Sequence, residues 1–482
     1  MKSVNISSLV DRYTRKSSTF GKKIRLEQAF LEAILYDWPV GAQIPTHRIL
    51  CRELSVARNT LSEVTKKLIS EGYLYACQGS GTWTCCPPYP KTKNFLPIKE
   101  DLSLSGRAQK VLGNYGASPI QSSSFVPGVP DISLFPMRKW RELYSSITVP
   151  SNALLLSYSS GGYGPLKRQV RNFLKRWRNI DCDTRQIIIT EGTHNSIDLC
   201  ALALSDFDEN VIMESPCYWG ARNVFQASGL DTYMIPWSPV YGHDLNELPE
   251  EPVKLAYLTG SRHYPLSVPA SRKDKISLCE KCDPEYIIED DYEFGGGDYD
   301  GLLFDPESSN NFLVGSFSKM MFPGLRLGYL VAPKSLADSI NKLRSEVFRE
   351  GRLLDQAVLA EFISGGSLDT WYNNIHRDYF GRQQVVYDQI SQVNGVVDVS
   401  QPKRGVSMCV QFRKNIDDRR VAKLLMKENL IVRPLSPVCS GSDNRCGLVI
   451  GVGMLSGASL ASEAARLRVE MESVLKSSDV WL

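Results

Sequence analysis

The chain has 482 residues, of which 43% are hydrophobic and 23% are charged, as in ordinary globular proteins. This length exceeds what one hydrophobic core normally organises, so we expect several domains. No run of about 20 apolar residues occurs, and the N-terminus lacks the apolar core of a signal peptide, so neither a membrane span nor export is expected. The twelve cysteines show no disulfide-framework spacing, which favours reduced thiols in a cytoplasmic protein.

Positive charge is concentrated near the N-terminus. Residues 1–86 contain 12 Lys and Arg against 7 Asp and Glu, a net charge of +5, whereas the whole chain carries only +3. The remaining four-fifths of the chain is therefore slightly acidic. A small basic module on a nearly neutral body favours an anionic partner such as nucleic acid.

Hydrophobic spacing in this basic module predicts three helices followed by a hairpin. Pro39 and Gly41 end the first helix, Thr46 is a plausible N-cap for the second, and Gly72 closes the third. The expected elements are helices at 24–35, 47–54 and 61–71, and strands at 73–75 and 82–84 around a glycine-rich tip. This order predicts a winged helix-turn-helix, in which the third helix enters the major groove of DNA.

Four short motifs in this module resemble the DNA-binding domain of GntR-type bacterial regulators. They are PTHR at 45–48, ARNT at 57–60, EGYL at 71–74 and GSGT at 79–82. Ala57 stands where the pattern has a serine, at the expected cost of one phosphate hydrogen bond. The resemblance implies a double-stranded DNA operator as partner, contacted by Arg48, Arg58, Asn59, Thr60 and Gly79. The alternative interpretation is a solvated basic face without DNA contacts.

Composition then divides the rest of the chain. Residues 87–124 are rich in Pro, Lys, Asn and Ser and predict an interdomain linker with one short helix near 104–112. From 125 to 482 short apolar runs alternate with helical stretches, the pattern of an α/β domain. We therefore expect a multidomain protein with a DNA-binding domain at 1–86 and an effector domain at 125–482.

Polar side chains follow the predicted strands of the α/β domain. Strands are expected at 187–190, 211–213, 255–258, 286–288 and 312–314. The residues that follow them include Gly192 and Thr193, Tyr218, Asp290 and Tyr292, and Ser316 with Ser318. Ligands of open parallel sheets bind at the carboxyl ends of the strands, so these groups are expected to converge there.

The stretch GSFSKMMFPGLRLGY at 315–329 places Lys319 between two serines, with Arg326 seven residues further on. Desolvation by the apolar residues that follow would lower the pKa of this lysine and make it a nucleophile toward an aldehyde. Arg326 and the serine hydroxyls suit a phosphate. An aldehyde combined with a phosphate describes pyridoxal 5'-phosphate (PLP). A plain buried strand end with a surface lysine is the alternative.

Each of the other polar residues at the strand ends has an expected contact with PLP. Asp290 would keep the pyridine nitrogen protonated, Tyr292 would hydrogen-bond the 3-oxygen of the ring, and Tyr218 would stack on it. Lys319 would form the Schiff base. The groups expected to hold the phosphate are Gly192, Thr193, Ser316, Ser318 and Arg326. Two solvated loop carboxylates are the alternative for Asp290 and its neighbour Asp291.

These residues resemble the fold type I aminotransferases, the α/β PLP-dependent transferase fold, and the two-domain arrangement resembles the MocR/GabR family of regulators. The resemblance covers most of the chain and is carried by FVPGVPDISLFPMRKW at 125–140, SYSSGGYGPLKRQV at 157–170, IIITEGTHNSIDL at 187–199, MESPCYWGAR at 213–222 and IIEDDYEF at 287–294. It implies a head-to-tail homodimer in which Tyr158 reaches the phosphate bound by the partner subunit.

Two departures from the aminotransferase pattern weaken the case for catalysis. The asparagine that the family places near Tyr264 is missing. Val449 occupies the position of the C-terminal arginine that grips the substrate carboxylate. An α-amino acid would therefore bring an unpaired charge into the pocket, unless Arg222, Arg262 or His263 binds it from another direction. The expected effector is PLP itself, or an amine or amino acid held in a different way.

Three functions compete. The first is a transcriptional regulator that senses such an effector and is not an enzyme with sustained turnover. The second is a working aminotransferase with an accessory DNA-binding domain, and the third is a DNA-binding protein that no longer uses a cofactor. The winged helix and Val449 favour the first, and the complete cofactor set disfavours the third. No metal site is expected, since Cys279-x-x-Cys282 lacks a second pair of ligands nearby.

Overall fold

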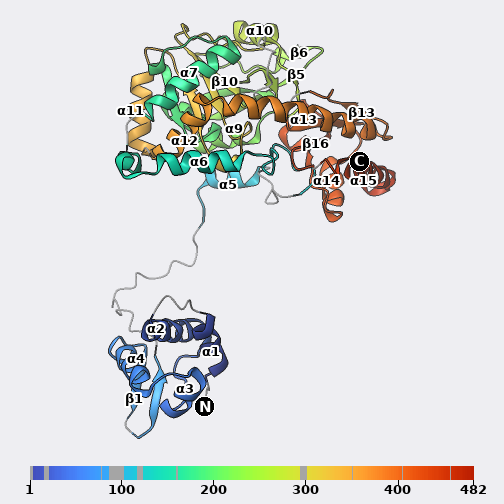
Figure 1. Cartoon of the computed structure of the whole chain (residues 1–482). Coiled ribbons are helices and arrows are strands. Elements are labelled where there is room, and N and C mark those ends of the chain that lie inside the picture. The colour runs from blue at the N-terminus through green and yellow to red at the C-terminus, as the bar shows by residue number, and fades with distance from the viewer. Residues whose placement is uncertain are drawn as a thin grey trace. The chain divides into compact units, whose positions relative to one another are not determined.

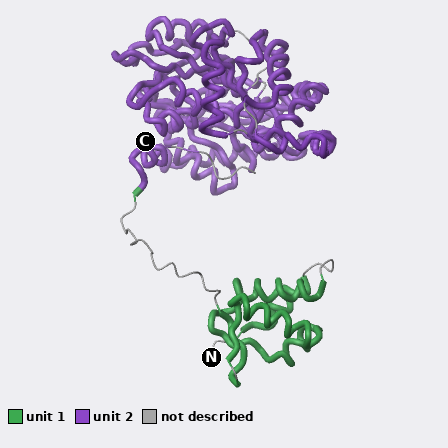
Figure 2. The backbone as a smooth tube through the Cα atoms, turned by 90° about the vertical axis from the view of Figure 1, so that its left-hand side faces the viewer, with its two compact units in different colours: residues 1–103 green, residues 104–482 purple. Residues whose placement is uncertain are grey.

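The computed structural model divides the chain into two compact units, residues 1–103 and 104–482 (Figure 2). It describes residues 4–15, 21–77, 79–85, 103–114, 116, 123–158, 161–293, 301–349, 351–403, 405–455 and 457–481. Across these ranges, no helix is both long enough and apolar enough to cross a membrane. The division between the units falls inside the predicted linker, whose residues 87–102 and 117–122 lie outside the described part of the chain.

The smaller unit has the predicted three helices and hairpin, preceded by one further helix. Its elements are α1 (Ile6–Arg15), α2 (Lys22–Glu32) continued by the π-helical turn η1 (Ala33–Asp37), α3 (His47–Leu54), α4 (Arg58–Ser70), β1 (Leu74–Cys77) and β2 (Gly81–Thr84). The winged helix-turn-helix is thereby confirmed. The sequence pattern does not predict α1, since only Leu9 and Tyr13 of this helix are buried, too few for a periodic signal.

Burial of one face of each helix holds this unit together. Leu26 and Phe30 of α2, Leu50 of α3, and Leu61 and Leu68 of α4 are almost completely buried in one cluster. The tight turn between α3 and α4 passes through a left-handed residue at position 55. The two strands pair antiparallel, and the hydroxyl at position 84 donates to the backbone oxygen of residue 39 at 2.6 Å. The wing is therefore fixed to the helical core.

The larger unit is built on an eight-stranded sheet in the order β3-β12-β11-β10-β7-β4-β5-β6. The strands are β3 (Ile187–Thr190), β4 (Asn210–Ser215), β5 (Asp231–Ser238), β6 (Gly242–His243), β7 (Leu255–Thr259), β10 (Tyr286–Asp291), β11 (Asn311–Ser316) and β12 (Gly328–Val331). All five predicted strands are present. The sheet is mixed rather than purely parallel, because β12 runs antiparallel to β11 and β3, and β6 runs antiparallel to β5.

Helices cover both faces of this sheet (Figure 1). Alternate strand residues point to opposite sides, so Ile187 and Ile189 belong to one core cluster and Ile188 to another. The first cluster includes side chains of α7 (Gly164–Arg178), α12 (Leu353–Ser364) and α13 (Ser367–Ile390). The second includes side chains of α8 (Thr193–Leu204), α9 (Trp219–Ser228) and α11 (Ala337–Phe348). This three-layer arrangement explains why the predicted strands consist of nearly continuous apolar runs.

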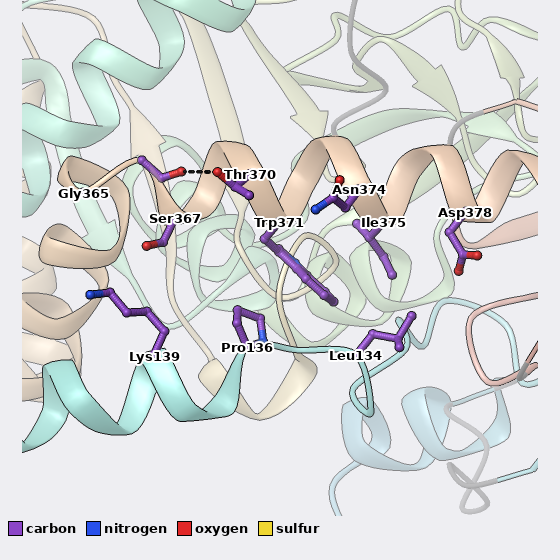
Figure 3. A pocket seen from close by; sticks show the side chains of 11 residues that line it. Leu134, Pro136, Lys139, Gly365, Ser367, Thr370, Trp371, Asn374, Ile375 and Asp378 are labelled. Atoms are coloured by element: carbon purple, nitrogen blue, oxygen red, sulfur yellow. Dashed lines mark hydrogen bonds between the residues drawn. The ribbon is translucent and has the colours of Figure 1, made fainter.

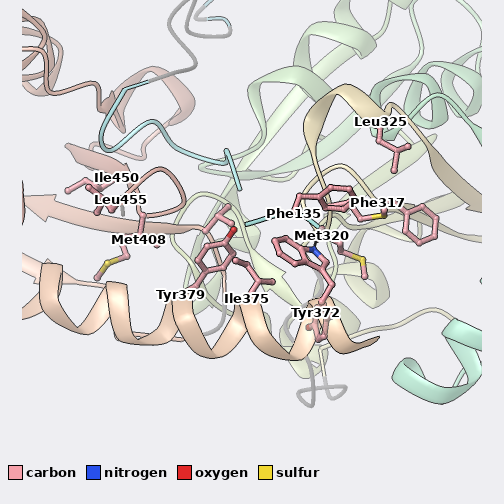
Figure 4. Close-up of a cluster of buried hydrophobic side chains, with 14 of the residues drawn as sticks. Phe135, Phe317, Met320, Leu325, Tyr372, Ile375, Tyr379, Met408, Ile450 and Leu455 are labelled. Carbon is pink, nitrogen blue, oxygen red and sulfur yellow. Dashed lines mark hydrogen bonds between the residues drawn. The ribbon is translucent and has the colours of Figure 1, made fainter. Parts of the chain in front are cut away.

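A smaller lobe completes the unit. It contains a four-stranded sheet in the order β13-β14-β16-β15. The long helix α13 joins the two lobes, with Tyr372 and Ile375 near Phe135 and Met320, and Tyr379 on the side of Met408 (Figure 4). The remaining elements are β13 (Val396–Val399), β14 (Ser407–Phe412), β15 (Arg433–Pro434), β16 (Gly447–Gly451), α14 (Asp418–Lys427), α15 (Leu460–Lys476), α6 (Met137–Ile147), α10 (Arg272–Cys282), the hairpin β8 (Arg262–His263) with β9 (Val268–Pro269), and the 3-10 turns η2 (Pro150–Leu156), η3 (Thr184–Gln186), η4 (Leu245–Glu247), η5 (Pro323–Leu325), η6 (Ser436–Val438) and η7 (Ser478–Val480).

The short helix expected near 104–112 is α5 (Gly106–Gly113), and it belongs to the larger unit. The side-chain amide of Asn114 donates to Asn223 at 2.8 Å and to Gln226 at 2.7 Å, and Arg107 donates to the backbone oxygen of Ala227. These contacts tie α5 to α9. Compact structure of the larger unit thus begins before residue 125, the start that composition indicates.

Candidate functional site

The carboxyl ends of β3, β10 and β11 and the start of β12 meet at one edge of the sheet. Asp291 pairs with Gly315, and Gly328 pairs with both Ser316 and Thr190. Glycine is required at two of these positions. A Cβ on Gly315 would lie 2.1 Å from the ring of Tyr329, and one on Gly328 would lie 2.7 Å from a backbone oxygen. Absence of these side chains lets the strands bring their polar termini together.

A cavity of about 320 Å³ opens at this edge. Seven of the predicted cofactor residues line it, namely Thr193, Tyr218, Tyr292, Ser316, Ser318, Lys319 and Arg326. The sequence reasoning did not assign several other lining residues, of which His194, Glu293 and Arg433 carry titratable or charged groups. The convergence expected from the strand ends is therefore present in the folded chain.

Lys319 lies half-buried in the wall of this cavity and donates a hydrogen bond to the backbone oxygen of Gly128. Burial lowers the pKa of its amine to about 8, with Glu293 opposing the shift and Arg433 adding to it. Near neutral pH an appreciable fraction of this amine is consequently unprotonated. Such a lysine is a competent nucleophile toward an aldehyde.

Asp290 is 2% exposed and is not among the lining residues of the cavity, although Tyr292, two residues further on, is. Its Oδ2 accepts a hydrogen bond from the hydroxyl of Tyr257 at 2.6 Å, whereas the buried Oδ1 has no hydrogen-bond partner among the residues that the structure describes. Burial raises the pKa of this carboxyl to about 7, although Tyr257 opposes the shift. A cationic N–H group beside Oδ1 would satisfy it and restore its ionisation.

The two acidic neighbours of Asp290 both have a basic partner. Glu289 is paired with the buried amine of Lys275 at 2.9 Å, and Asp291 with Arg178 at 2.7 Å. Within the described ranges, Asp290 alone of the three has no basic partner. A buried carboxylate without a cation is costly, so this position suits a ligand that brings positive charge.

Groups suited to an anion gather at the other end of the site. Gly192, at a φ of +91°, precedes α8, and a Cβ there would lie 3.6 Å from the guanidinium of Arg326. The backbone N–H of Ser318 donates to the hydroxyl oxygen of Ser316 at 3.2 Å. The hydroxyl of Ser318 is buried and has no partner in the described structure. A helix start, a guanidinium and a hydroxyl without a partner in the described structure are groups that suit a phosphate.

Tyr218 is held by a residue that the sequence reasoning missed. His194 and the tyrosine hydroxyl are 2.7 Å apart, and burial lowers the pKa of the imidazole, with smaller effects from the charges of Arg326 and Lys319. A Cβ on Gly220 would lie 2.2 Å from the histidine ring. The signal was present in the sequence, since His194 directly follows Thr193 at the start of α8.

Tyr158 is the one predicted cofactor residue that the fold places away from the cavity. Its side chain is 73% exposed, and the guanidinium of Arg349 lies 5.1 Å from its ring centre. It does not line the cavity of its own chain. The expected role of Tyr158 therefore requires a second subunit.

The predicted DNA-binding residues belong to the smaller unit. Arg48, Arg58 and Asn59 are exposed and Thr60 is half-buried. Arg58 is the first residue of α4, and Ala57 before it supplies no side-chain cap. Gly79 is exposed at the hairpin tip with open space around its Cα.

A more open cavity of about 470 Å³ lies between α6 and α13 (Figure 3). It is lined by Leu134 and Trp371 among others, with Lys139 and Asp378 as its charged residues. None of the predicted cofactor residues reaches it. No cluster of side chains that could hold a metal ion occurs in the described part of the chain. The chemistry is therefore concentrated in the cavity around Lys319.

Comparison with known proteins agrees with this geometry. The family model for aminotransferase class I and II matches residues 150–447, more than half of the chain. The chain belongs to the aminotransferase class I and II family. Residues 150–447 contain every predicted cofactor residue, from Tyr158 to Arg326.

Several curated relatives are regulators that match almost the whole chain. The probable rhizopine catabolism regulatory protein MocR of Rhizobium meliloti is 28% identical over 420 residues, 85% of both chains. The HTH-type transcriptional regulator TauR of Rhodobacter capsulatus is 28% identical over 85% of this chain and 88% of its own. The pyridoxine biosynthesis transcriptional regulator PdxR of Corynebacterium glutamicum is 26% identical over 86% and 87%. The predicted resemblance to MocR/GabR-type regulators is thereby confirmed.

Solved structures confirm the predicted transferase fold. A multiple substrate aminotransferase from Thermococcus profundus matches 78% of this chain and 96% of its own, with a TM-score of 0.66 at 18% identity. Kynurenine aminotransferase from Pyrococcus horikoshii matches the same shares, with a TM-score of 0.65 at 20% identity. At this identity the likeness establishes the fold alone.

The raised pKa of Asp290 predicts how stability varies with pH. Its ordinary value is 3.8 and the folded value is about 7, so between about pH 4 and pH 7 the folded protein holds a proton that the unfolded chain releases. Stability contributed by this group therefore falls as the pH rises through that window, by at most about 1.4 kcal/mol per pH unit, and levels off above it.

Urea unfolding at pH values from 5 to 8 checks this expectation, with protein treated with hydroxylamine to release any bound aldehyde and then dialysed. The free energy of unfolding of the wild type minus that of Asp290→Asn should decrease from pH 5 to 7 and then become constant. A difference that does not vary with pH would contradict the buried, cation-free environment of Asp290.

Proposed function

We propose that this protein is a PLP-binding transcriptional regulator whose aminotransferase-like domain senses PLP itself, an amine or an amino acid. The observation that carries the proposal is the presence, in one chain, of a winged helix and of a cavity with a nucleophilic lysine above a cation-free buried carboxylate. The regulators MocR, TauR and PdxR resemble the chain over about 85% of its length, which supports the same conclusion. Operator DNA as a partner places this function in the bacterial cytoplasm.

The smaller unit is suited to DNA through the exposed start of α4. Arg58 projects there, and Arg48 is exposed on the preceding helix α3. The ring nitrogen of His47 at the start of α3 lies 3.2 Å from the hydroxyl of Thr65 in α4. Burial lowers the pKa of this imidazole, and the charge of Arg58 adds to the shift. We propose that Arg58, Asn59 and Thr60 contact base edges or phosphates, with Arg48 and the wing at Gly79 on the backbone.

The cavity residues fit PLP group by group. Asp290 Oδ1 would accept the pyridinium N–H, and Lys319 would bond to the aldehyde. Tyr218 and Tyr292, whose ring centres lie 5.6 and 5.8 Å from that of Tyr264, would contact the ring and its 3-oxygen. Residues proposed to hold the phosphate are Gly192, Thr193, Ser316, Ser318 and Arg326. When bound, PLP supplies an aldehyde that can exchange the lysine for a ligand amine.

A head-to-tail homodimer would complete the site. Six large apolar side chains between residues 132 and 158 are at least half exposed, an unusual density for a free surface. They are Ile132, Leu134, Met137, Leu154, Leu156 and Tyr158. We propose that this segment is covered by a second copy of the chain, which brings Tyr158 to the phosphate of the partner subunit.

An active aminotransferase is the second candidate, favoured by the completeness of the cofactor site. Val449 argues against it, because this side chain is 2% exposed in an apolar cluster with Trp237 and Leu435 and offers no charge to a substrate. A substrate is then not held in the orientation that proton transfer requires. We therefore propose binding without sustained turnover.

A DNA-binding experiment tests the regulatory part. Replacing Arg58 with Ala should weaken binding to an operator selected from random DNA by about 1–3 kcal/mol, or about 5- to 150-fold, if its guanidinium contacts a guanine. Arg58→Lys retains the charge and should recover only part of the loss. Binding should also weaken as salt rises. Arg419→Ala, an exposed arginine of the larger unit, serves as the control, and unchanged affinity of the Arg58 variant would rule out this docking.

Covalent trapping tests the cofactor site. Sodium borohydride should fix PLP to the peptide that contains Lys319, as seen by mass spectrometry after proteolysis, and Lys319→Ala should abolish both the label and the yellow colour. Lys334→Ala is the matched control, since that amine is exposed and paired with Glu307 at 2.6 Å. A label on a different lysine would refute the assignment.

A turnover assay separates the two candidates. PLP-loaded protein mixed with alanine or glutamate and a keto acid should produce no sustained transamination over many protein equivalents. A single equivalent of product fits a sensor. Rapid, continuous turnover would instead establish the aminotransferase.

A further inference from the structure

The cavity contains one guanidinium to which the proposed function gives no role. Three basic residues line it, Lys319, Arg326 and Arg433. PLP binding would engage Lys319 through its aldehyde and Arg326 through its phosphate. Arg433 also lines the cavity and is left without a group of the cofactor to bind.

Strand pairing explains how Arg433 reaches this space. It forms β15 with Pro434, and β15 pairs antiparallel with β16 so that Arg433 lies directly opposite Val449. Val449 is the position at which the aminotransferase pattern has its carboxylate-binding arginine. The adjacent strand thus carries an arginine directly opposite the position where the pattern has one.

The surroundings of Arg433 leave its charge available. Its guanidinium carbon lies 5.6 Å from the ring centre of Trp219, and its Nε is buried without a hydrogen-bond partner in the described structure. Its charge contributes to the lowered pKa of Lys319 and moderates the raised pKa of Tyr218, so it acts on both cavity residues. Glu293 is the one carboxylate among the lining residues that the structure describes, and it lies 3.6 Å from Arg262.

The other basic candidates near the site are engaged elsewhere. Arg262 pairs with Glu293 and donates to the backbone of β14, and Arg222 donates to the backbone oxygen of Pro437. His263 is completely buried against Trp237, and burial lowers its pKa to about 4, so it is neutral near pH 7. None of the three lines the cavity.

We propose that Arg433 binds the carboxylate of an effector whose amino group reaches the cofactor at Lys319. This inference rests on the proposed function and specifies its ligand as a small amine that carries a carboxylate. A guanidinium forms charge-assisted, often bidentate bonds with a carboxylate, and the Nε without a partner would gain one. If this proposal holds, a ligand carboxylate would have a partner in the pocket despite Val449.

Anchoring from β15 rather than β16 also fits binding without turnover. The carboxylate would be gripped from a strand position different from that of the family's enzymes. The amino group can then exchange at the cofactor while the rest of the ligand lies in a different orientation. Arg433 is accordingly a specificity-determining residue rather than a catalytic one.

Paired ligands isolate the contribution of the carboxylate. PLP-loaded full-length protein is titrated with β-alanine and, separately, with propylamine, which has the same carbon chain without the carboxylate. Alanine and ethylamine form a second pair. The change in visible absorption of the bound cofactor gives each dissociation constant, and calorimetry checks it by heat. The wild type should prefer the carboxylate-bearing member of at least one pair by about ten- to hundredfold, as a charge-assisted bond provides.

Variants assign this preference to Arg433. Arg433→Gln should reduce the affinity ratio within the pair to about one or below, Arg433→Lys should retain part of it, and Arg419→Gln should leave it unchanged. Each ratio is measured on one cofactor-loaded sample, so any general loss of cofactor or amine affinity cancels.

The outcomes separate the two proposals. Borohydride-trapped PLP on Lys319 together with an unchanged ratio in Arg433→Gln would overturn the role of Arg433 and leave the cofactor site standing. If the wild type does not prefer the carboxylate-bearing ligand in either pair, the role of Arg433 is likewise overturned and the cofactor site stands. Failure of the wild type to bind PLP would contradict the proposed function, and this inference with it.

Discussion

The site depends above all on one buried carboxylate. Asp290 ends its strand in the middle of three consecutive acidic residues, and the fold gives Glu289 and Asp291 cations from α10 and α7. Within the described part of the chain, the Asp290 side chain has one hydrogen-bond partner, the hydroxyl of Tyr257. The resulting electrostatic cost, visible in the raised pKa of Asp290, is the term that a bound pyridinium would offset. The residues proposed to hold the aldehyde and the phosphate of PLP would position the pyridinium so that it can pair with Asp290.

The two paired neighbours also set the position of Asp290. The Lys275 amine donates to Glu289 and to two backbone oxygens, at positions 260 and 301. Arg178 donates to Asp291 and to the hydroxyl of Ser261. These buried contacts bind β10 to the loops on either side, and removal of one partner from such a pair typically costs about 3–5 kcal/mol. A rigid strand end is what a cofactor site requires, because small displacements weaken every directed bond.

Residues from both lobes of the larger unit line the cavity. Lys319 follows β11, Arg326 precedes β12, and Arg433 enters from the smaller lobe on β15. The cavity therefore combines groups from the central sheet, proposed to hold the cofactor, with one from the other lobe, proposed to hold the effector. A ligand that bridges both would bind the two lobes of the larger unit together, a direct way for an effector to alter its conformation.

Sequence alone determined the parts that rest on local chemistry. Helical periodicity and turn residues predicted the winged helix, and apolar runs followed by polar residues predicted five strands and the cofactor residues from Gly192 to Arg326. Strand β5 was beyond this reasoning because it contains Pro236 and is partly exposed, and β12 because it begins within the lysine stretch, whose residues were assigned to the cofactor. Only the tertiary structure decided that Asp290 lacks a cation, that His194 supports Tyr218, and that Arg433 lies opposite Val449. The physical reason is that pairing across strands and burial depend on residues far apart in the chain, which no local pattern records.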